Sequence, residues 1–237
     1  MNRSKKILFT FIFGCFLSSA IAQFGVNVQY QDNDYKSWNE VINSTGLNEN
    51  HELFKRNFKI GVDYSFDMAM YRVSFFPEIS YAWSDFSFTK SSDSKDYTFN
   101  LTQYAFNFKT QVYPLDLLSK KSSQCPSFHR GMDKFTKGWY LLVFPELVFS
   151  DKKGNYTDNQ DQVTEFNDPG YSFKFGIGTG IDLGISKHIS ISPYVMYLFT
   201  VGEKWEGFSQ NGFGQPSFND GTEVGTLAIG VRVGFWF

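Results

Sequence analysis

The sequence is poor in the residues on which catalytic centres and disulfide frameworks depend. Its 237 residues include 2 cysteines and 3 histidines. Cys15 lies in the first 22 residues, and a chain processed after that segment keeps only Cys125, which has no partner for an internal disulfide. The fold must then be held by backbone hydrogen bonds and packing. No pattern of ligands, nucleophile and base stands out, so we expect no metal, no cofactor and no catalytic residue.

Long apolar runs are also missing. The run from Ile7 to Leu17 is shorter than the roughly 20 residues that a helix needs to cross a bilayer. It follows a basic start and leads to Ala20-Ile21-Ala22, the pattern of a secretory signal with a small-x-small cleavage site. We therefore expect residues 1–22 to be a cleaved signal peptide and residues 23–237 to be the mature chain. A membrane anchor, or a lipoprotein acylated at Cys15, fits this segment less well.

The balance of charge excludes another class of partner. The chain has 22 basic and 24 acidic residues, and the first 22 residues hold three of the basic ones and none of the acidic ones. The mature chain is therefore net acidic. Nucleic-acid-binding domains carry a basic patch or an excess of Lys and Arg. We expect no nucleic acid partner.

Aromatic residues, in contrast, are abundant. They make up 19% of the chain, with 28 Phe, yet charged or strongly polar residues interrupt every apolar segment after the first 22 residues. In hydrocarbon every backbone polar group needs an internal partner, and a closed barrel provides it with strands that are apolar only on alternate residues. The composition therefore favours a transmembrane β-barrel.

Alternation with a period of two recurs along the chain. It is clearest at 171–184, where Tyr171, Phe173 and Phe175 alternate with Ser172, Lys174 and glycines. The other alternating segments are 24–30, 58–67, 71–84, 97–113, 139–150, 188–200 and 227–237. We predict an all-β fold, an antiparallel up-and-down barrel of about eight membrane-spanning strands in one domain, 23–237.

One of these segments changes parity. Phe99 and Leu101 lie on one parity of 97–113, whereas Tyr104 and Phe106 lie on the other. A switch of this kind within one strand predicts a β-bulge, which we place near Thr102-Gln103.

The connections between the strands differ in length. In such barrels the external loops are long and the periplasmic turns are short. The predicted external loops are 31–56, 87–96, 151–170 and 201–222, and the turns after the second and sixth strands are very short. The connection from Leu115 to about Lys137 departs from the rule because it is long on the periplasmic side. It is basic and contains Cys125, so it is either a solvated turn or a docking site.

The last strand ends on Phe235-Trp236-Phe237. An alternating terminal strand with a C-terminal Phe resembles the assembly signal read by the bacterial barrel-insertion machinery, with Phe235 and Phe237 as its outward residues. The mature chain resembles the small outer-membrane barrels of the OmpA and OmpX type. The segments Phe76-Pro77-Glu78 and Phe144-Pro145-Glu146 look more like barrel families of Bacteroidota. The resemblance implies a Gram-negative outer membrane location, with outer-membrane lipids, lipopolysaccharide and the insertion machinery as partners.

The parity opposite the apolar one is expected to face the barrel interior. It forms a charge network of both signs: Lys59, Arg72, Glu78, Lys109, Glu146, Lys174, Asp182 and Arg232. A barrel of eight strands is just wide enough to be filled by its own side chains, which favours a salt-bridged plug over a charged ion path. We expect Glu78 and Glu146 to pair with Arg72, Lys174 or Arg232 rather than to act as an acid and base.

Enzymatic activity has little support in the sequence. Outer-membrane lipid A deacylases and acyltransferases place a His with a Ser near the external rim, and omptin proteases use His and Asp. Here His129 and His188 fall on the predicted periplasmic side, and His51 has no Ser or Asp motif around it. We predict that the chain is not an enzyme.

The predicted external loops are rich in aromatic residues. Candidate partner-binding residues are Trp38 in the first loop and Trp205, Phe208, Phe213 and Phe218 in the last. About half of the loop aromatics are explained by an interfacial girdle, but those at loop tips favour contact with another protein or a glycan. We predict a non-enzymatic structural or binding component that acts either alone or as a subunit of an envelope complex, such as a secretion or surface-attachment assembly. A narrow porin-like pore is the alternative, and a lipid-modifying enzyme is third.

Overall fold

The computed structural model describes residues 23–34, 54–68, 72–90, 95–114, 138–157, 163–186, 188–203 and 222–236. These residues form one antiparallel sheet that closes on itself, because β1 pairs with β2 on one side and with β9 on the other. The strands are β1 (Gln23–Asp34), β2 (Arg56–Met68), β3 (Val73–Lys90), β4 (Lys95–Val112), β5 (Trp139–Thr157), β6 (Val163–Ile181), β7 (Leu183–Gly184), β8 (Ile189–Glu203) and β9 (Thr222–Trp236). Among the described residues no helix is long and apolar enough to cross a membrane.

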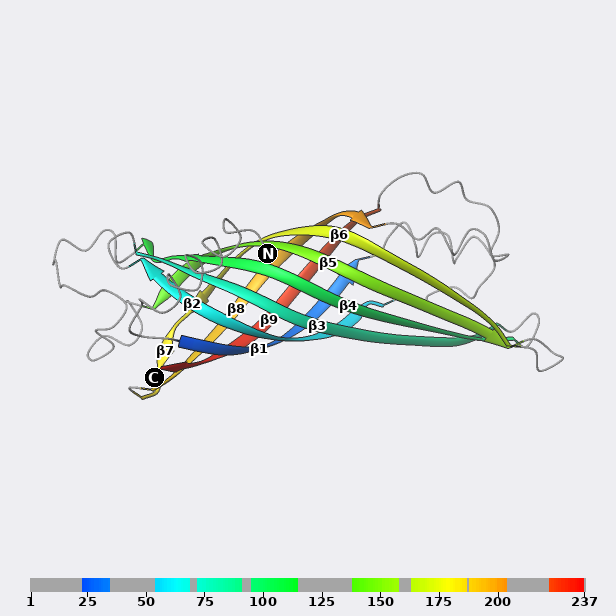
Figure 1. Ribbon diagram of the computed structural model, residues 1–237, viewed down its shortest axis with the longest axis horizontal. Coiled ribbons are helices and arrows are strands. Elements are labelled where there is room, and N and C mark those ends of the chain that lie inside the picture. The colour runs from blue at the N-terminus through cyan, green and yellow to red at the C-terminus, as the bar shows by residue number, and fades with distance from the viewer. Residues whose placement is uncertain are drawn as a thin grey trace, which may run out of the picture.

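The barrel has eight strands, as predicted from the alternating segments. β6 and β7 both pair with β8 in one continuous register and are two parts of the same strand, separated at Asp182. Pro193 of β8 lies beside this break and has no N–H to donate to the ladder. Figure 1 shows the strands crossing the barrel diagonally, as closure of a sheet requires.

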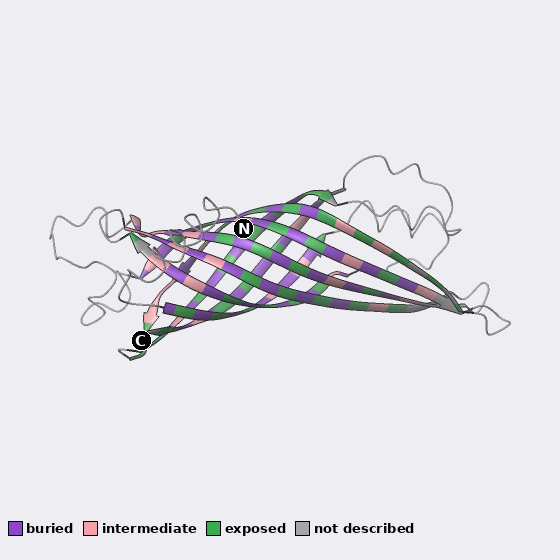
Figure 2. Cartoon of the chain, in the orientation of Figure 1, coloured by how far each residue is buried: buried purple, intermediate pink, exposed green. Residues whose placement is uncertain are grey.

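Residues alternate between an outer face and a packed interior. In β1, Phe24, Val26 and Val28 are exposed while Asn27 and Gln29 are buried. Buried and exposed residues alternate in the same way along the other strands, as the colours in Figure 2 show. The outer face is therefore apolar and the interior is largely polar, the reverse of a water-soluble barrel. The predicted inward and outward parities are confirmed in the central part of each strand.

Four strands continue beyond the others at one end. β3 and β4 pair as far as Lys90 and Lys95, and β5 and β6 as far as Thr157 and Val163. β2 accompanies β3 only to Trp83, and β8 accompanies β6 only up to Phe173. We name residues 84–90, 95–101, 152–157 and 163–172 the projecting sheet, which forms the long tip of the molecule in Figure 1. The prediction of external loops at 87–96 and 151–170 was therefore wrong, since most of these residues extend the hairpins.

The predicted bulge in β4 is also absent. β4 keeps one register with β3 and with β5 along its length, without a shift at Thr102 or Gln103. Phe99 and Leu101 point to the inside and are each 1% exposed. The outer face at the same level carries exposed Asn100 and Lys153. The polarity of the two faces of β4 therefore inverts here. This part of β4 lies beyond the apolar belt, the exposed apolar residues such as Val62, Ile79 and Phe106 that surround the barrel.

Candidate functional site

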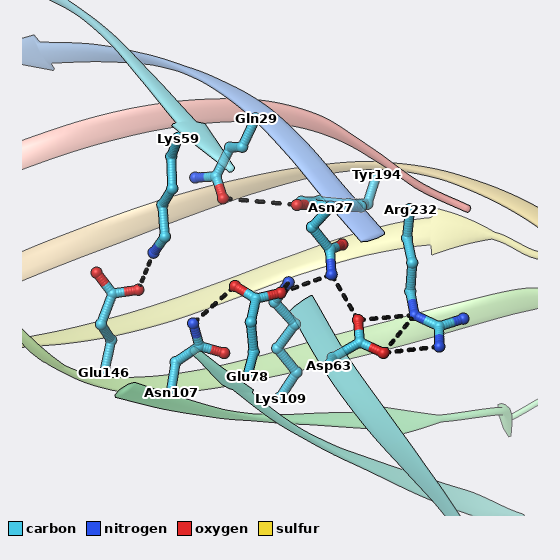
Figure 3. A network of polar contacts seen from close by, with 10 residues as sticks. All are labelled: Asn27, Gln29, Lys59, Asp63, Glu78, Asn107, Lys109, Glu146, Tyr194 and Arg232. Atoms are coloured by element: carbon cyan, nitrogen blue, oxygen red, sulfur yellow. Dashed lines mark hydrogen bonds and ion pairs between the residues drawn. The ribbon is translucent and has the colours of Figure 1, made fainter. Parts of the chain in front are cut away.

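Three buried ion pairs occupy the middle of the lumen (Figure 3). Arg232 of β9 contacts Asp63 of β2, with an Nη2–Oδ1 distance of 2.7 Å. Lys109 of β4 pairs with Glu78 of β3. Lys59 of β2 pairs with Glu146 of β5, across the lumen. All six side chains are at most 4% exposed, so each charge has lost its water and depends on its partner.

Carboxamides join two of these pairs into one network. Asn27 Nδ2 donates to Asp63 Oδ2 at 2.5 Å and to Glu78 Oε2 at 2.6 Å. Asn107 Nδ2 donates to Glu78 Oε1 at 2.8 Å. The polar contacts therefore run from β9 through β2, β1 and β3 to β4, as Figure 3 shows. A chain of contacts across five strands fixes their relative positions.

The Arg232–Asp63 pair spans the seam between the first and last strands. Arg232 Nε donates to both carboxylate oxygens of Asp63, at 3.0 and 2.9 Å. The pair passes over Gly25 of β1, where an added Cβ would lie 2.4 Å from Arg232 Nε and 2.5 Å from Asp63 Oδ1. A glycine is required at this position because the guanidinium crosses directly above the backbone.

Aromatic rings pack against the cations. Phe144 lies 5.1 Å from Lys59 Nζ and 5.5 Å from Lys109 Nζ, so the two ammonium groups share one ring. The guanidinium of Arg232 lies 4.7 Å from the ring of Phe76. Cation–π contacts of this kind strengthen where water is excluded.

The two Phe-Pro-Glu segments have the same structural role. In each, the Phe and the Glu point into the lumen and the proline points outward. The ladder between β2 and β3 skips the two pairs at Phe76 and Pro77, and the ladder between β4 and β5 skips the two pairs at Phe144 and Pro145. Each segment thus supplies one ring and one carboxylate to the lumen network and interrupts the hydrogen bonds to the preceding strand.

Apolar side chains fill the other side of the lumen. Tyr140, Phe144, Leu198 and Ala228 are 0% exposed and belong to one buried cluster with Tyr194. Inward glycines make room for this cluster: a Cβ at Gly230 would lie 2.4 Å from the Tyr194 ring, and a Cβ at Gly180 would lie 2.3 Å from the Tyr140 hydroxyl. The described lumen is packed with side chains on its polar side and on its apolar side.

The ion pairs differ from those expected from the sequence. Glu78 and Glu146 bind Lys109 and Lys59, which the sequence analysis did not select as their partners. Arg72 was expected in the lumen, but it precedes β3 with φ of 56° and is half-buried. Its carbonyl accepts a hydrogen bond from Tyr113 N at 3.1 Å, so it belongs to the end of the barrel. The left-handed turn at Arg72 removes it from the alternation of β3.

The two remaining predicted network residues are Lys174, on β6, and Asp182, directly after the end of β6. Lys174 is 2% exposed and lies opposite Glu146 in the register. Asp182 is half-buried at the break between β6 and β7, where it accepts hydrogen bonds from Ser192 and, at 2.5 Å, from the Tyr113 hydroxyl. Its backbone N–H donates to Gly138 O at 2.8 Å. Asp182 therefore fastens the barrel end rather than the central network.

Several predicted residues lie outside the described residues. These are the loop aromatics Trp38, Trp205, Phe208, Phe213 and Phe218, the terminal Phe237, the signal segment 1–22 and the connection 115–137 with Cys125. Phe235 is exposed and pairs with Phe24 of β1. His188 is the one histidine in the described ranges, and it is exposed beside the last turn of the barrel. In those ranges no group of three or more His, Cys, Asp or Glu could hold a metal ion.

The projecting sheet is the functional candidate that the sequence analysis missed. Its outer face carries the exposed polar residues Asp85, Ser87, Lys153, Glu165 and Asn167, together with exposed Val163 and Tyr171 of β6. Lys153 Nζ and Asp151 Oδ2 lie 3.2 Å apart there and are much more exposed than the lumen pairs. The signal for this sheet was the parity change at Phe99 and Leu101, which we interpreted as a bulge.

No protein-family model matches the sequence, and no curated protein matches it. The chain is similar to solved outer-membrane structures. It is 12% identical to the attachment invasion locus protein Ail of Yersinia pestis, covering 91% of this chain and 98% of that one, with a TM-score of 0.41. It is 10% identical to a major outer membrane protein of Thermus thermophilus, covering 91% of this chain and 99% of that one, with a TM-score of 0.45. It is 13% identical to the N-terminal β-barrel domain of Pseudomonas aeruginosa OprF, covering 90% of this chain and 97% of that one, with a TM-score of 0.33. At these levels the similarities assign no function.

Proposed function

We propose that this chain is an outer-membrane barrel that acts as a non-enzymatic binding component, presenting its external end to a partner. The observation that carries the proposal is the projecting sheet. Four strands continue past the apolar belt with a mainly polar outer face, while the lumen beneath them is packed. A structure of this kind offers a surface at its external end and no route through its centre.

Membrane insertion follows from the outer face of the barrel. Ile79 is 72% exposed and Val62 is 57% exposed, and exposed apolar residues surround the barrel in the same way. A continuous apolar surface of this extent is not tolerated in water. Aromatic residues flank this surface on both sides. Phe24 and Phe75 lie toward the end where β1 begins and β9 ends, and Tyr81 and Tyr104 lie toward the projecting sheet. This is the arrangement of an outer-membrane barrel with two aromatic girdles.

The external end would then hold the predicted partner-binding residues. The segments between β1 and β2 and between β8 and β9 carry Trp38, Trp205, Phe208, Phe213 and Phe218. Burying such side chains in a partner contributes about 1.5 to 3 kcal/mol each. A partner in the envelope, such as a secretion or surface-attachment complex, fits this chemistry, and the basic connection 115–137 is a second candidate surface on the periplasmic side.

The test replaces Trp205, Phe208, Phe213 and Phe218 together by Ser. The quadruple variant should still migrate faster on gels when unheated than when boiled, since loop residues add little to barrel stability. It should lose the proteins that co-purify with the tagged wild type from native membranes. A matched control replaces Gln210, Asn211, Gln215 and Asn219 of the same segment by Ser and should keep them. Retention of every partner by the aromatic variant contradicts the proposal for this loop.

A narrow pore is the second candidate, because the ion pairs in the lumen are the one feature of the described strands that suits an ion path. The buried rings around them oppose it. Planar bilayer recordings decide between the two, since a packed lumen gives no stable open channel at ordinary salt.

A further inference from the structure

The projecting sheet has two edges, and the described residues leave both of them without a neighbouring strand. On one side β3 has no partner after Trp83, and on the other β6 has none before Phe173. An unpaired edge presents backbone N–H and C=O groups that can pair with a further strand. We infer that the β3 edge, from Asp85 to Lys90, binds an extended segment of another protein by strand addition. The inference deepens the proposed function and rests on it.

Phe54 and Asn33 explain why β2 leaves β3. Phe54 precedes β2 with φ of 47°, a left-handed conformation that L-residues rarely adopt. Asn33 of β1 binds this turn twice, since its side chain donates to Phe54 O at 3.0 Å and its backbone N–H donates to Lys55 O at 2.8 Å. Phe54 and Lys55 are therefore held against β1, and they do not continue the pairing of β2 with β3. Among the described residues, the β3 edge beyond Trp83 thus has no neighbouring strand.

The hydrogen-bond pattern identifies the groups on this edge. Along a strand within an antiparallel sheet, successive residues direct their N–H and C=O to opposite neighbours. Pro77 interrupts the ladder with β2, which shows that odd-numbered residues of β3 face that side. Asp85, Ser87 and Thr89 consequently direct their N–H and C=O groups to the open edge, while the even-numbered residues between them pair with β4.

The β6 edge is protected against the same interaction. Pro145 interrupts the ladder with β4, which shows that odd-numbered residues of β5 direct their N–H and C=O groups to β4. Even-numbered residues of β5 therefore bond to β6, where they lie opposite even-numbered residues. Odd-numbered residues of β6 consequently direct their N–H and C=O groups away from β5. Pro169 is therefore on the open side and has no N–H to offer. A proline on an edge strand prevents pairing at its position, and β3 has no proline from Ser84 to Lys90.

A second copy of this chain does not fit the β3 edge. Copies inserted in one membrane all run β3 toward the outside, so two β3 edges cannot pair antiparallel. The open edge of β6 runs in the opposite direction, but Pro169 has no N–H to donate from it. Parallel pairing would tilt one barrel against the other, because the strands cross the barrel axis diagonally (Figure 1). The occupant is therefore a strand of a different protein that reaches the external end. Exposed Asp85 favours a basic residue opposite it.

Amide hydrogen exchange in detergent micelles tests whether the edge is open. The N–H groups of Asp85, Ser87 and Thr89 should exchange quickly in the isolated protein, and those of Phe86 and Phe88 slowly. Slow exchange of all five would mean that another segment of this chain, such as 35–53, already occupies the edge, and would overturn the inference.

A peptide tests the binding itself. The probe is a fluorescein-labelled peptide with the sequence of residues 95–104, the segment that pairs with the other edge of β3. The wild-type barrel should bind it saturably, and Ser87→Pro should weaken binding at least about tenfold, because it removes a central donor and places a ring on the edge. Asn167→Pro, on the open side of β6, should bind as the wild type does. No saturable binding, equal binding by Ser87→Pro, or loss in Asn167→Pro overturns the inference.

Both variants must show heat-modifiable migration before they are compared. The outcomes for the edge and for the proposed function can be told apart. If Ser87→Pro has no effect while the four-aromatic variant loses its partners, the edge inference fails and the binding component stands.

Discussion

Removing one partner of the Arg232–Asp63 pair should destabilise the barrel far more than removing an exposed ion pair. Asp63 is 2% exposed and Arg232 is 3% exposed, and three hydrogen bonds join them. Arg232→Met leaves the Asp63 carboxylate buried beside the neutral Asn27 carboxamide, which still donates to it. An uncompensated buried charge of this kind costs about 3 to 5 kcal/mol. We expect Asp63→Leu to cost a similar amount.

The double variant Arg232→Met/Asp63→Leu distinguishes a paired charge from a simple loss of contacts. Replacement of a whole buried ion pair by apolar side chains is often close to neutral. The double variant should therefore be more stable than either single variant. Lys153→Met is the control, because the Lys153–Asp151 pair has side chains that are 60% and 35% exposed and should contribute about 0 to 1 kcal/mol.

The assay is urea unfolding in detergent micelles, followed by tryptophan fluorescence and by the loss of the fast-migrating gel band. The reasoning is refuted if the two single variants cost no more than Lys153→Met. It is also refuted if the double variant costs the sum of the single variants, since additive effects would show that the two charges do not interact.

Gly230→Ala should lower the free energy of unfolding by about 1 to 3 kcal/mol in the same urea assay, because its Cβ would lie 2.4 Å from the Tyr194 ring; unchanged stability would show that the ring moves freely. Planar bilayers containing the wild-type barrel should show no stable channel, whereas ion-selective conductance altered by Glu78→Ala would favour the pore. Mass spectrometry of the protein from outer membranes should give a chain that begins at Gln23, and a chain that retains residues 1–22 would contradict cleavage.

The strands and the faces of the barrel could be predicted from the sequence because the environment repeats with the strand period. Lipid on one side and a packed polar lumen on the other impose apolar and polar residues in strict alternation, as in β1 and β6. The rule holds only within the belt. Phe99 and Leu101 mark where β4 leaves it, and their change of parity was misread as a bulge because the sequence does not show where the membrane ends.

The partners in the lumen could not be predicted for a different reason. Alternation gives the face of a residue but not its level along the barrel, which depends on the register of every strand. Lys59 meets Glu146 across the lumen although β3 and β4 lie between β2 and β5 in the sheet, so neither sequence spacing nor strand order indicates the pair. The prediction for Arg72 failed because one left-handed residue ends the alternation before β3 begins.

Cysteine labelling on intact cells tests the central claim, an outer-membrane barrel whose projecting sheet faces outward. In a Cys125→Ser background, Ser87→Cys on the projecting sheet should react with a membrane-impermeant maleimide. Ile79→Cys in the apolar belt should not react, and His188→Cys at the opposite end should react only after the outer membrane is permeabilised. Labelling of Ile79→Cys or His188→Cys in intact cells, or protection of Ser87→Cys until permeabilisation, would contradict the account.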